Sequence, residues 1–208
     1  MKASPLRGLY AITDEKLIAP DEFSNTLERA LLGGTTIIQY RDKSKDSSKR
    51  LEQASLLKAL CETHGAALII NDDIELAVSV AAHGVHLGKD DSSIDEARKM
   101  LGESTIIGIS CYNQLHKALE AEQAGADYVA FGTMFASPTK PAAATAGTDL
   151  ITEAKKQLSI PVCAIGGIDS SNVEDVVNAG ADMTALISGL FAAQDIQSTA
   201  RHISELFR

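Results

Sequence analysis

Eight short apolar segments alternate with helical patterns along almost the whole chain, and this alternation limits the possible folds more than any other feature. The segments are residues 8–12, 35–40, 67–70, 84–87, 105–110, 128–131, 162–165 and 183–187. Continuous apolar runs are typical of parallel strands that are buried on both faces. Between them, segments such as 47–64 have apolar residues three and four positions apart, which predicts helices with one buried stripe. Eight such units with right-handed crossovers predict a closed (β/α)8 TIM barrel, and an open doubly wound sheet is the alternative.

The residues between the segments agree with this architecture. Ser93 with Glu96, and Ser171 with Glu174, have the spacing of capping boxes and predict two helix starts. The sequence Ala-Gly-Ala-Asp occurs twice, and each copy ends a helical pattern with a glycine and opens a strand. A length of 208 residues without a Pro/Gly/Ser-rich linker predicts one barrel domain over residues 1–208.

Charge and composition exclude several classes of protein. A formal net charge of -9 argues against a nucleic-acid binder, because phosphate-backbone affinity comes mainly from Lys and Arg. No stretch approaches the roughly 18 apolar residues of a membrane span, and the N-terminus has no apolar signal segment. Cys61, Cys111 and Cys163 lack metal-ligand spacing and are predicted to be reduced thiols. We therefore expect a cytoplasmic protein, and the sequence does not decide between a monomer and a homo-oligomer.

In a barrel of this kind the chemistry lies beyond the C-terminal ends of the strands, and the second strand ends in the sequence QYRDK. Alternation predicts that Gln39, Arg41 and Lys43 point together toward the barrel mouth, whereas Tyr40 and Asp42 point away. The alternative is a solvated loop in which Asp42 pairs with a neighbour, since exposed charge runs are common.

Carboxylates follow the third and fourth strands. Asn71, Asp72 and Asp73 end the third strand, and Asp90 and Asp91 come shortly after the fourth. Oxygen ligands on neighbouring strand ends favour Mg²⁺ bound together with a phosphate. For Asp73 and Asp90 we prefer a helix-capping role.

Glycines and hydroxyls follow the last three strands. Residues 166–168 read Gly-Gly-Ile and residues 187–189 read Ile-Ser-Gly, at the positions where barrels often bind phosphate through backbone N–H groups. Residues 137–140, in the longer loop after the sixth strand, add two hydroxyls and a cation for a second anion. Two anion sites across one mouth predict a diphosphate substrate facing a monophosphate substrate. His86 is predicted to be a structural strand residue, since no second histidine lies at metal-ligand spacing.

The motifs QYRDK, NDD, GVHLGKDD, GIS, SPTK, AIGGI and ISG occur in this order, and together they closely resemble the thiamine-phosphate synthase family. The resemblance runs from about Leu9 to Gly189. It implies a Mg²⁺-dependent transferase that joins 4-amino-5-hydroxymethyl-2-methylpyrimidine diphosphate to 4-methyl-5-(2-phosphoethyl)thiazole. The products implied are thiamine phosphate and pyrophosphate.

The resemblance also implies a role for each matching residue. The pyrimidine diphosphate is contacted by Gln39, Arg41, Lys43, Asn71 and Ser110; Mg²⁺ is bound by Asp72 and Asp91; the loop residues Ser137, Thr139 and Lys140 contact the substrates; and the thiazole phosphate is held by Gly167, Ile187 and Ser188. Of these, Arg41, Lys43, Ser110 and Lys140 are the implied catalytic residues.

Two departures from the family pattern and two rival functions accompany this interpretation. The loop from Ser137 to Lys140 reads SPTK where the family usually has PTxTK, and Lys89 stands where glutamine is common. A related thiazole tautomerase would need an acid or base but no diphosphate clamp, and His116 lies deep in a helical pattern. A catalytically silent thiamine-binding regulatory barrel would not need to keep Arg41, Lys43 and the two aspartates together.

Overall fold

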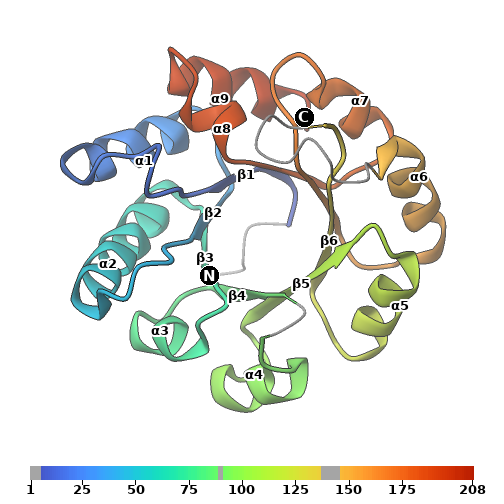
Figure 1. Cartoon of the computed structure of the whole chain (residues 1–208), viewed down its shortest axis with the longest axis horizontal. Coiled ribbons are helices and arrows are strands. Elements are labelled where there is room, and N and C mark those ends of the chain that lie inside the picture. Colours follow the sequence, from blue (N-terminus) through green and yellow to red (C-terminus); the bar gives the residue numbers. More distant parts are fainter. Residues whose placement is uncertain (1–5, 89–90, 137–145) are drawn as a thin grey trace.

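The computed structural model describes residues 6–88, 91–136 and 146–208, and its strands form one closed parallel barrel (Figure 1). Each strand is hydrogen-bonded to the next in chain order, and β8 pairs with β1. The strands are β1 (Gly8–Ile12), β2 (Ile37–Tyr40), β3 (Ala67–Asn71), β4 (Gly84–Leu87), β5 (Ile106–Tyr112), β6 (Tyr128–Phe131), β7 (Val162–Ile165) and β8 (Met183–Leu186). The predicted (β/α)8 barrel is thus confirmed, and the open sheet is excluded.

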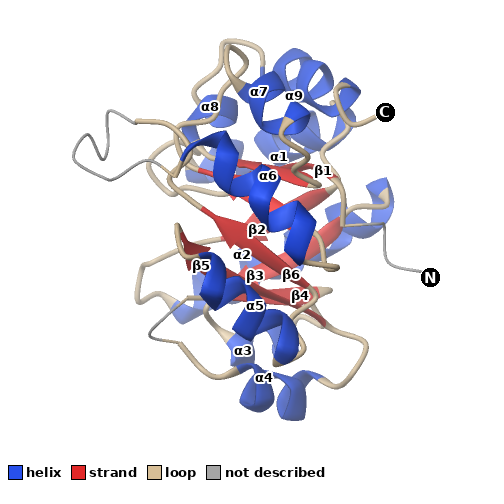
Figure 2. Ribbon diagram, turned by 90° about the vertical axis from the view of Figure 1, so that its right-hand side faces the viewer, coloured by secondary structure: helices blue, strands red, loops and turns tan. Residues whose placement is uncertain are grey.

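Helices surround the barrel on its outer side (Figures 1 and 2). They are η1 (Pro20–Glu22), α1 (Phe23–Leu32), α2 (Ser47–His64), α3 (Ile74–Ser79), α4 (Ile94–Leu101), α5 (Leu115–Gln123), α6 (Gly147–Gln157), α7 (Val173–Asn178), α8 (Ser188–Phe191) and α9 (Ile196–Glu205). Within the described ranges, none of these helices combines the length and the hydropathy that crossing a membrane requires.

One of the two predicted capping boxes is present, and the other is wrong. Ser93 and Glu96 form the reciprocal pair of bonds at the start of α4. Helix α7 instead begins after Asn172, one residue later than predicted. The reason is that Ser171 is engaged elsewhere, since its N–H and hydroxyl donate to Asp169 Oδ1 at 2.8 and 2.6 Å.

Alternate residues of each strand enter different hydrophobic layers. Leu9 and Ala11 of β1 belong to the larger cluster, which lies between the strands and the helices. Tyr10 and Ile12 belong to a second cluster together with interior residues of the other strands, such as Ile37. Burial on both faces explains why the strand segments are apolar throughout.

The repeated Ala-Gly-Ala-Asp sequence closes the end of the barrel opposite the mouth. Asp127 Oδ2 accepts the N–H of a residue near the start of β5 at 2.8 Å and pairs with Arg98 at 2.9 Å. Asp182 Oδ2 accepts the first N–H of β7 at 2.7 Å and pairs with Lys155 at 2.7 Å. Each aspartate therefore joins the start of its own strand to the preceding strand and to the helix that leads into that preceding strand.

Candidate active site

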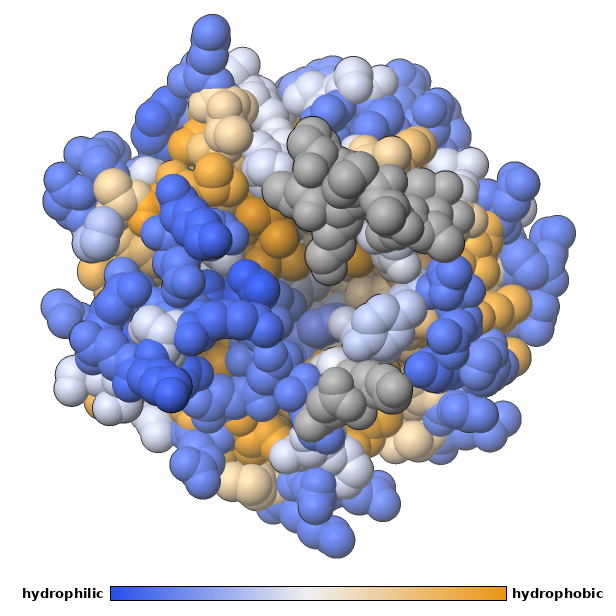
Figure 3. All heavy atoms as spheres, viewed as in Figure 1, coloured by the Kyte–Doolittle hydropathy of each residue, from blue (hydrophilic) through white to orange (hydrophobic). Residues whose placement is uncertain are grey.

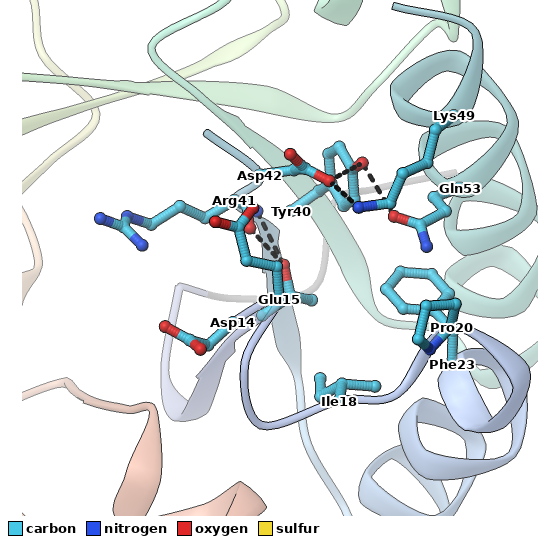
Figure 4. Close-up of a pocket in the computed structure, with 11 residues that line it drawn as sticks. Asp14, Glu15, Ile18, Pro20, Phe23, Tyr40, Arg41, Asp42, Lys49 and Gln53 are labelled. Atoms are coloured by element: carbon cyan, nitrogen blue, oxygen red, sulfur yellow. Dashed lines mark hydrogen bonds and ion pairs between the residues drawn. The ribbon is translucent and has the colours of Figure 1, made fainter. Parts of the chain in front are cut away.

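The C-terminal end of β2 sends its side chains in two directions. Gln39 is buried in the barrel interior and donates through Nε2 to Tyr10 Oη at 2.8 Å. Arg41 extends away from α2 (Figure 4), and its backbone is held by two bonds with the Thr13 hydroxyl, at 2.8 and 3.1 Å. Lys43 is exposed beyond the strand end. The amide and the Arg41 side chain thus share the mouth side of the strand, as alternation predicted.

Tyr40 and Asp42 face the opposite way, toward α2 (Figure 4). Asp42 pairs with Lys49 at 2.7 Å and accepts the N–H of Ser44 at 2.6 Å, while Tyr40 bonds to Gln53 at 3.0 Å. Burial alone would raise the pKa of Asp42, but the bonds from Lys49 and Ser44 outweigh it and hold that pKa well below its usual range. The cavity among these side chains measures only about 20 Å³. Asp42 therefore anchors the end of β2.

Two carboxylates meet where β3 and β4 end. Asp72 has φ +63°, accepts a bond from the Asn71 amide at 2.5 Å and donates its own N–H to the carbonyl of His86. Burial, together with the adjacent Asp91 carboxylate, raises the pKa of Asp72 to about 6, against the opposing charge of Lys43. Asp91 Oδ2 accepts the N–H of Gly88 at 2.6 Å. Asp91 therefore does not cap α4.

A larger cleft opens beside these strand ends. Its volume is about 560 Å³, and the described residues that line it include Lys43, Asn71 and Asp72. The space-filling view along the barrel axis shows hydrophilic residues gathered on one side of the centre of this face, with hydrophobic residues next to them (Figure 3). The described part of the chain contains no group of three or more His, Cys, Asp or Glu side chains that could hold a metal ion.

Some residues considered in the sequence analysis have structural roles, and others lie outside the residues that the structure describes. Asp73 caps α3 through a bond from the Leu76 N–H at 2.8 Å and pairs with Arg50 at 2.7 Å, as preferred. Lys89 and Asp90 lie outside the described residues, and so do the loop candidates Ser137, Thr139 and Lys140.

A line of side-chain hydrogen bonds crosses the barrel interior beneath the mouth. Beyond the bond between Gln39 and Tyr10, Tyr10 Oη lies 2.8 Å from Tyr128 Oη. Tyr128 Oη lies 2.9 Å from His86 Nδ1, and His86 Nε2 lies 2.8 Å from Ser110 Oγ. These five residues are called the interior chain below. His86 is indeed a buried strand residue, but it also joins the candidate substrate residue Ser110 to Gln39.

Tyr10 and Tyr128 were not predicted as site residues. Tyr10 lies within an apolar strand segment and Tyr128 begins one, so the sequence indicates only that both are core aromatics. The one available signal is Gly108, the only glycine in the β5 segment, since a Cβ there would overlap the ring of Tyr128. The glycine provides the space that this ring fills. Burial lowers the pKa of His86 to about 4, although the charge of Asp91 opposes that shift.

The glycine side of the mouth is built by the loops after β6, β7 and β8. Gly166 O accepts the N–H of Phe135 at 3.0 Å, and Gly167 has φ +69°. Ile187 precedes α8, and Ser188 is its exposed first residue. A Cβ on Gly167 would overlap the backbone of Phe135. The β6 loop therefore already occupies the space that a side chain at Gly167 would need.

The three cysteines are buried thiols in the core of the barrel. Cys61, Cys111 and Cys163 are free and buried, and burial raises the pKa of Cys61 and of Cys111 to about 12. Thiols with such pKa values stay protonated and are poor nucleophiles.

Taken together, the closed barrel and its mouth define a (β/α)8-barrel enzyme with cations and paired carboxylates on one side and close-packed glycine backbone on the other. Comparison with known proteins makes this class specific. Residues 9–190 match the family model described as thiamine monophosphate synthase. The chain belongs to the thiamine monophosphate synthase family and is a transferase of thiamine biosynthesis.

Individual relatives are similar over nearly their full lengths. The thiamine-phosphate synthase of Thioalkalivibrio sulfidiphilus is 52% identical over 202 residues, which cover 97% of this chain and 96% of that protein. The thiamine-phosphate synthase of Nitrosococcus oceani is 52% identical over 198 residues, covering 95% and 91% respectively. The solved structure of thiamine phosphate pyrophosphorylase from Pyrococcus furiosus has a TM-score of 0.87 at 33% identity and covers 97% of this chain and 96% of that chain.

Proposed function

We propose that the enzyme joins 4-amino-5-hydroxymethyl-2-methylpyrimidine diphosphate to 4-methyl-5-(2-phosphoethyl)thiazole and releases pyrophosphate. The observation that carries this proposal is the cluster at the ends of β2 and β3. Lys43 lies close enough to Asp72 to lower its pKa, and Asp72 is paired with Asp91. Cations beside paired carboxylates suit a diphosphate with its metal ion, whereas a monophosphate alone would not require the carboxylates.

The residues present fit Mg²⁺. Two neighbouring carboxylates in a partly buried place repel each other, as the raised pKa of Asp72 reflects, and a bound cation removes that repulsion. Asp72 and Asp91 would hold the ion, with the remaining oxygen ligands coming from the diphosphate and water. When bound, Mg²⁺ supplies Lewis-acid stabilisation of the departing pyrophosphate. Arg41, Lys43 and Lys140 add positive charge around the same leaving group.

The reaction makes little demand on a general base. The attacking thiazole nitrogen carries no proton, and the aminopyrimidine spreads positive charge from its methylene carbon, which favours a dissociative, carbocation-like transition state. His86 is buried and hydrogen-bonded at both ring nitrogens, so it is not free to act as a base. Stabilisation of charge on the diphosphate is then the main task of the site.

On the other side of the mouth, Gly167, Ile187 and Ser188 would receive the thiazole phosphate. Close approach of loop backbone, with Gly167 at positive φ, leaves N–H groups as the natural partners of an anion. Asn71 holds the Asp72 carboxylate by a hydrogen bond and so supports the diphosphate side.

Measuring pyrophosphate release from the purified protein with both substrates tests this proposal. We expect release and thiamine phosphate formation with Mg²⁺, no release with either substrate alone, and strong inhibition by EDTA that added Mg²⁺ reverses. Full activity in EDTA would reject the metal role. Conversion of a thiazole isomer without pyrophosphate release would instead identify a tautomerase, and thiamine binding without turnover would identify a regulatory barrel.

A further inference from the structure

The hydrogen bonds of the interior chain have a direction that is set at one end. Gln39 faces Tyr10 through its amide nitrogen, which can only donate. The Tyr10 oxygen accepts that bond, so its own proton is available to Tyr128 at 2.8 Å. With the Tyr10 proton directed to Tyr128, the Tyr128 proton is left for His86 Nδ1, and a neutral His86 would then carry its proton on Nε2 and donate to Ser110.

We propose that this one-way order makes Tyr10, Tyr128 and His86 positioning residues that fix the hydrogen-bonding character of the pyrimidine site. Ser110 accepts from His86 and therefore presents its own O–H to the ligand. Gln39 uses one N–H toward Tyr10, which turns its carbonyl oxygen to the other side of the amide, where it can accept from the ligand. The two ends of the chain are then a fixed donor and a fixed acceptor.

The surroundings keep each member of the chain in the required form. Tyr10 and Tyr128 are 1% and 0% exposed, and burial raises the pKa of both phenols well above the ordinary value, so each retains the proton that it donates. Among the described residues, the His86 ring bonds to two hydroxyls and to no carboxylate. A charged ring would donate from both nitrogens and reverse the bond to Tyr128, and its burial disfavours that charge.

The packing of the rings shows that this arrangement is built into the barrel. Tyr10 and Tyr128 meet edge to face, with ring centroids 6.1 Å apart, and the His86 ring stacks on Tyr128 at 5.6 Å. Gly108 lies against Tyr128, where any side chain would overlap the ring. Neither hydroxyl can therefore move far from its partner without repacking the interior.

The direction of the chain predicts a specificity, which rests on the proposed function. An aminopyrimidine offers an amine donor and ring-nitrogen acceptors, which complement an acceptor at Gln39 and a donor at Ser110. The 4-oxo analogue, in which a carbonyl replaces the amine and a ring nitrogen gains a proton, reverses donor and acceptor on that edge. A site with fixed polarity rejects the reversed pattern, because buried polar groups are left unpaired.

The tautomer of His86 tests the proposal without any substrate. With the full chain labelled with ¹⁵N at histidine, and the His86 signals assigned from His86→Gln, we expect a neutral ring protonated at Nε2. Tyr128→Phe removes the donor to Nδ1 and should give a mixture of tautomers. Tyr10→Phe cuts the connection to Gln39, which sets the direction, and should also give a mixture of tautomers. Tyr40→Phe, a matched loss of a hydroxyl on the α2 side of β2, should keep the wild-type tautomer.

Substrate selectivity provides the second measurement. We expect kcat/KM to favour the amino over the oxo pyrimidine diphosphate by about a thousandfold or more, and Tyr128→Phe to reduce this ratio by about tenfold, mainly through KM. A ring protonated at Nδ1, an imidazolium, or an unchanged tautomer in Tyr128→Phe would overturn the proposal, as would unchanged selectivity. If Tyr128→Phe does not fold, the tautomer of His86 in the wild-type protein is the deciding measurement for the proposal. Absence of pyrophosphate release by the wild type would reject the proposed function but leave the tautomer result standing.

Discussion

Replacing Asp182 is expected to destabilise the barrel without slowing the reaction. Its carboxylate accepts the N–H of Val162 at 2.7 Å and pairs with Lys155 at 2.7 Å. Val162 is completely buried, so its N–H has no access to water. Asp182 and Val162 lie at the starts of β8 and β7, on the face opposite the mouth, where barrel residues support stability more than catalysis.

The size of the effect follows from these two bonds. Asp182→Ala leaves a buried N–H without a partner, which costs about 1–3 kcal/mol. Loss of the partly exposed pair with Lys155 adds at most about 1 kcal/mol. Asp182→Asn keeps an oxygen acceptor for the N–H and loses only the charge, so its cost should stay below about 1 kcal/mol. The difference between the two variants therefore measures the backbone bond alone.

Denaturant unfolding and thermal midpoints would measure these losses of stability, and kcat/KM would be measured for the same variants. For a chain of this length, about 1–4 kcal/mol for Asp182→Ala corresponds to a midpoint lower by about 2–16 °C, and Asp182→Asn should lie within about 4 °C of the wild type. The equivalent variants of Asp127 should show the same order, and Glu153→Ala, which breaks an exposed pair with Lys156, should change little. Equal losses for Ala and Asn, or lost activity at unchanged stability, would contradict the assignment.

Three further predictions concern the mouth. Lys43→Ala should slow single turnover by roughly a hundredfold to a thousandfold, about 3–4 kcal/mol, with little change in thermal midpoint, and Lys43→Arg should recover part of the loss; a normal rate would refute the role. The pKa of Asp72 is raised to about 6, so without Mg²⁺ its ionisation destabilises the fold above that pH and not near pH 4. Asp72→Asn should therefore stabilise the fold by about 1 kcal/mol in EDTA at pH 8, after allowance for solvent screening, and should leave the stability unchanged at pH 4. Equal stabilisation at both pH values would contradict this. Gly167→Ala should lower the midpoint and weaken both substrates, since its Cβ overlaps the Phe135 backbone, and an unchanged midpoint would exclude that overlap.

The sequence by itself determined the architecture and the side of the molecule on which the chemistry lies. Strand and helix patterns depend on residues only a few positions apart, so the helix over 47–64 and the eight strands could be read directly. The C-terminal ends of parallel strands meet on one face of any such barrel. For that reason Arg41, Lys43 and Asp72 could be assigned to a common mouth before any distance was known.

Only the tertiary structure decided how the interior of the site is organised. Tyr10 and Tyr128 are 118 residues apart in the chain, and each reads locally as an apolar strand residue. Their hydroxyls meet because closure of the barrel brings β1 and β6 across a common interior from opposite sides. The space that Gly167 leaves for Phe135 likewise depends on how two loops pack. Such contacts are set by the curvature and register of the closed sheet, which no residue pattern within a single strand records.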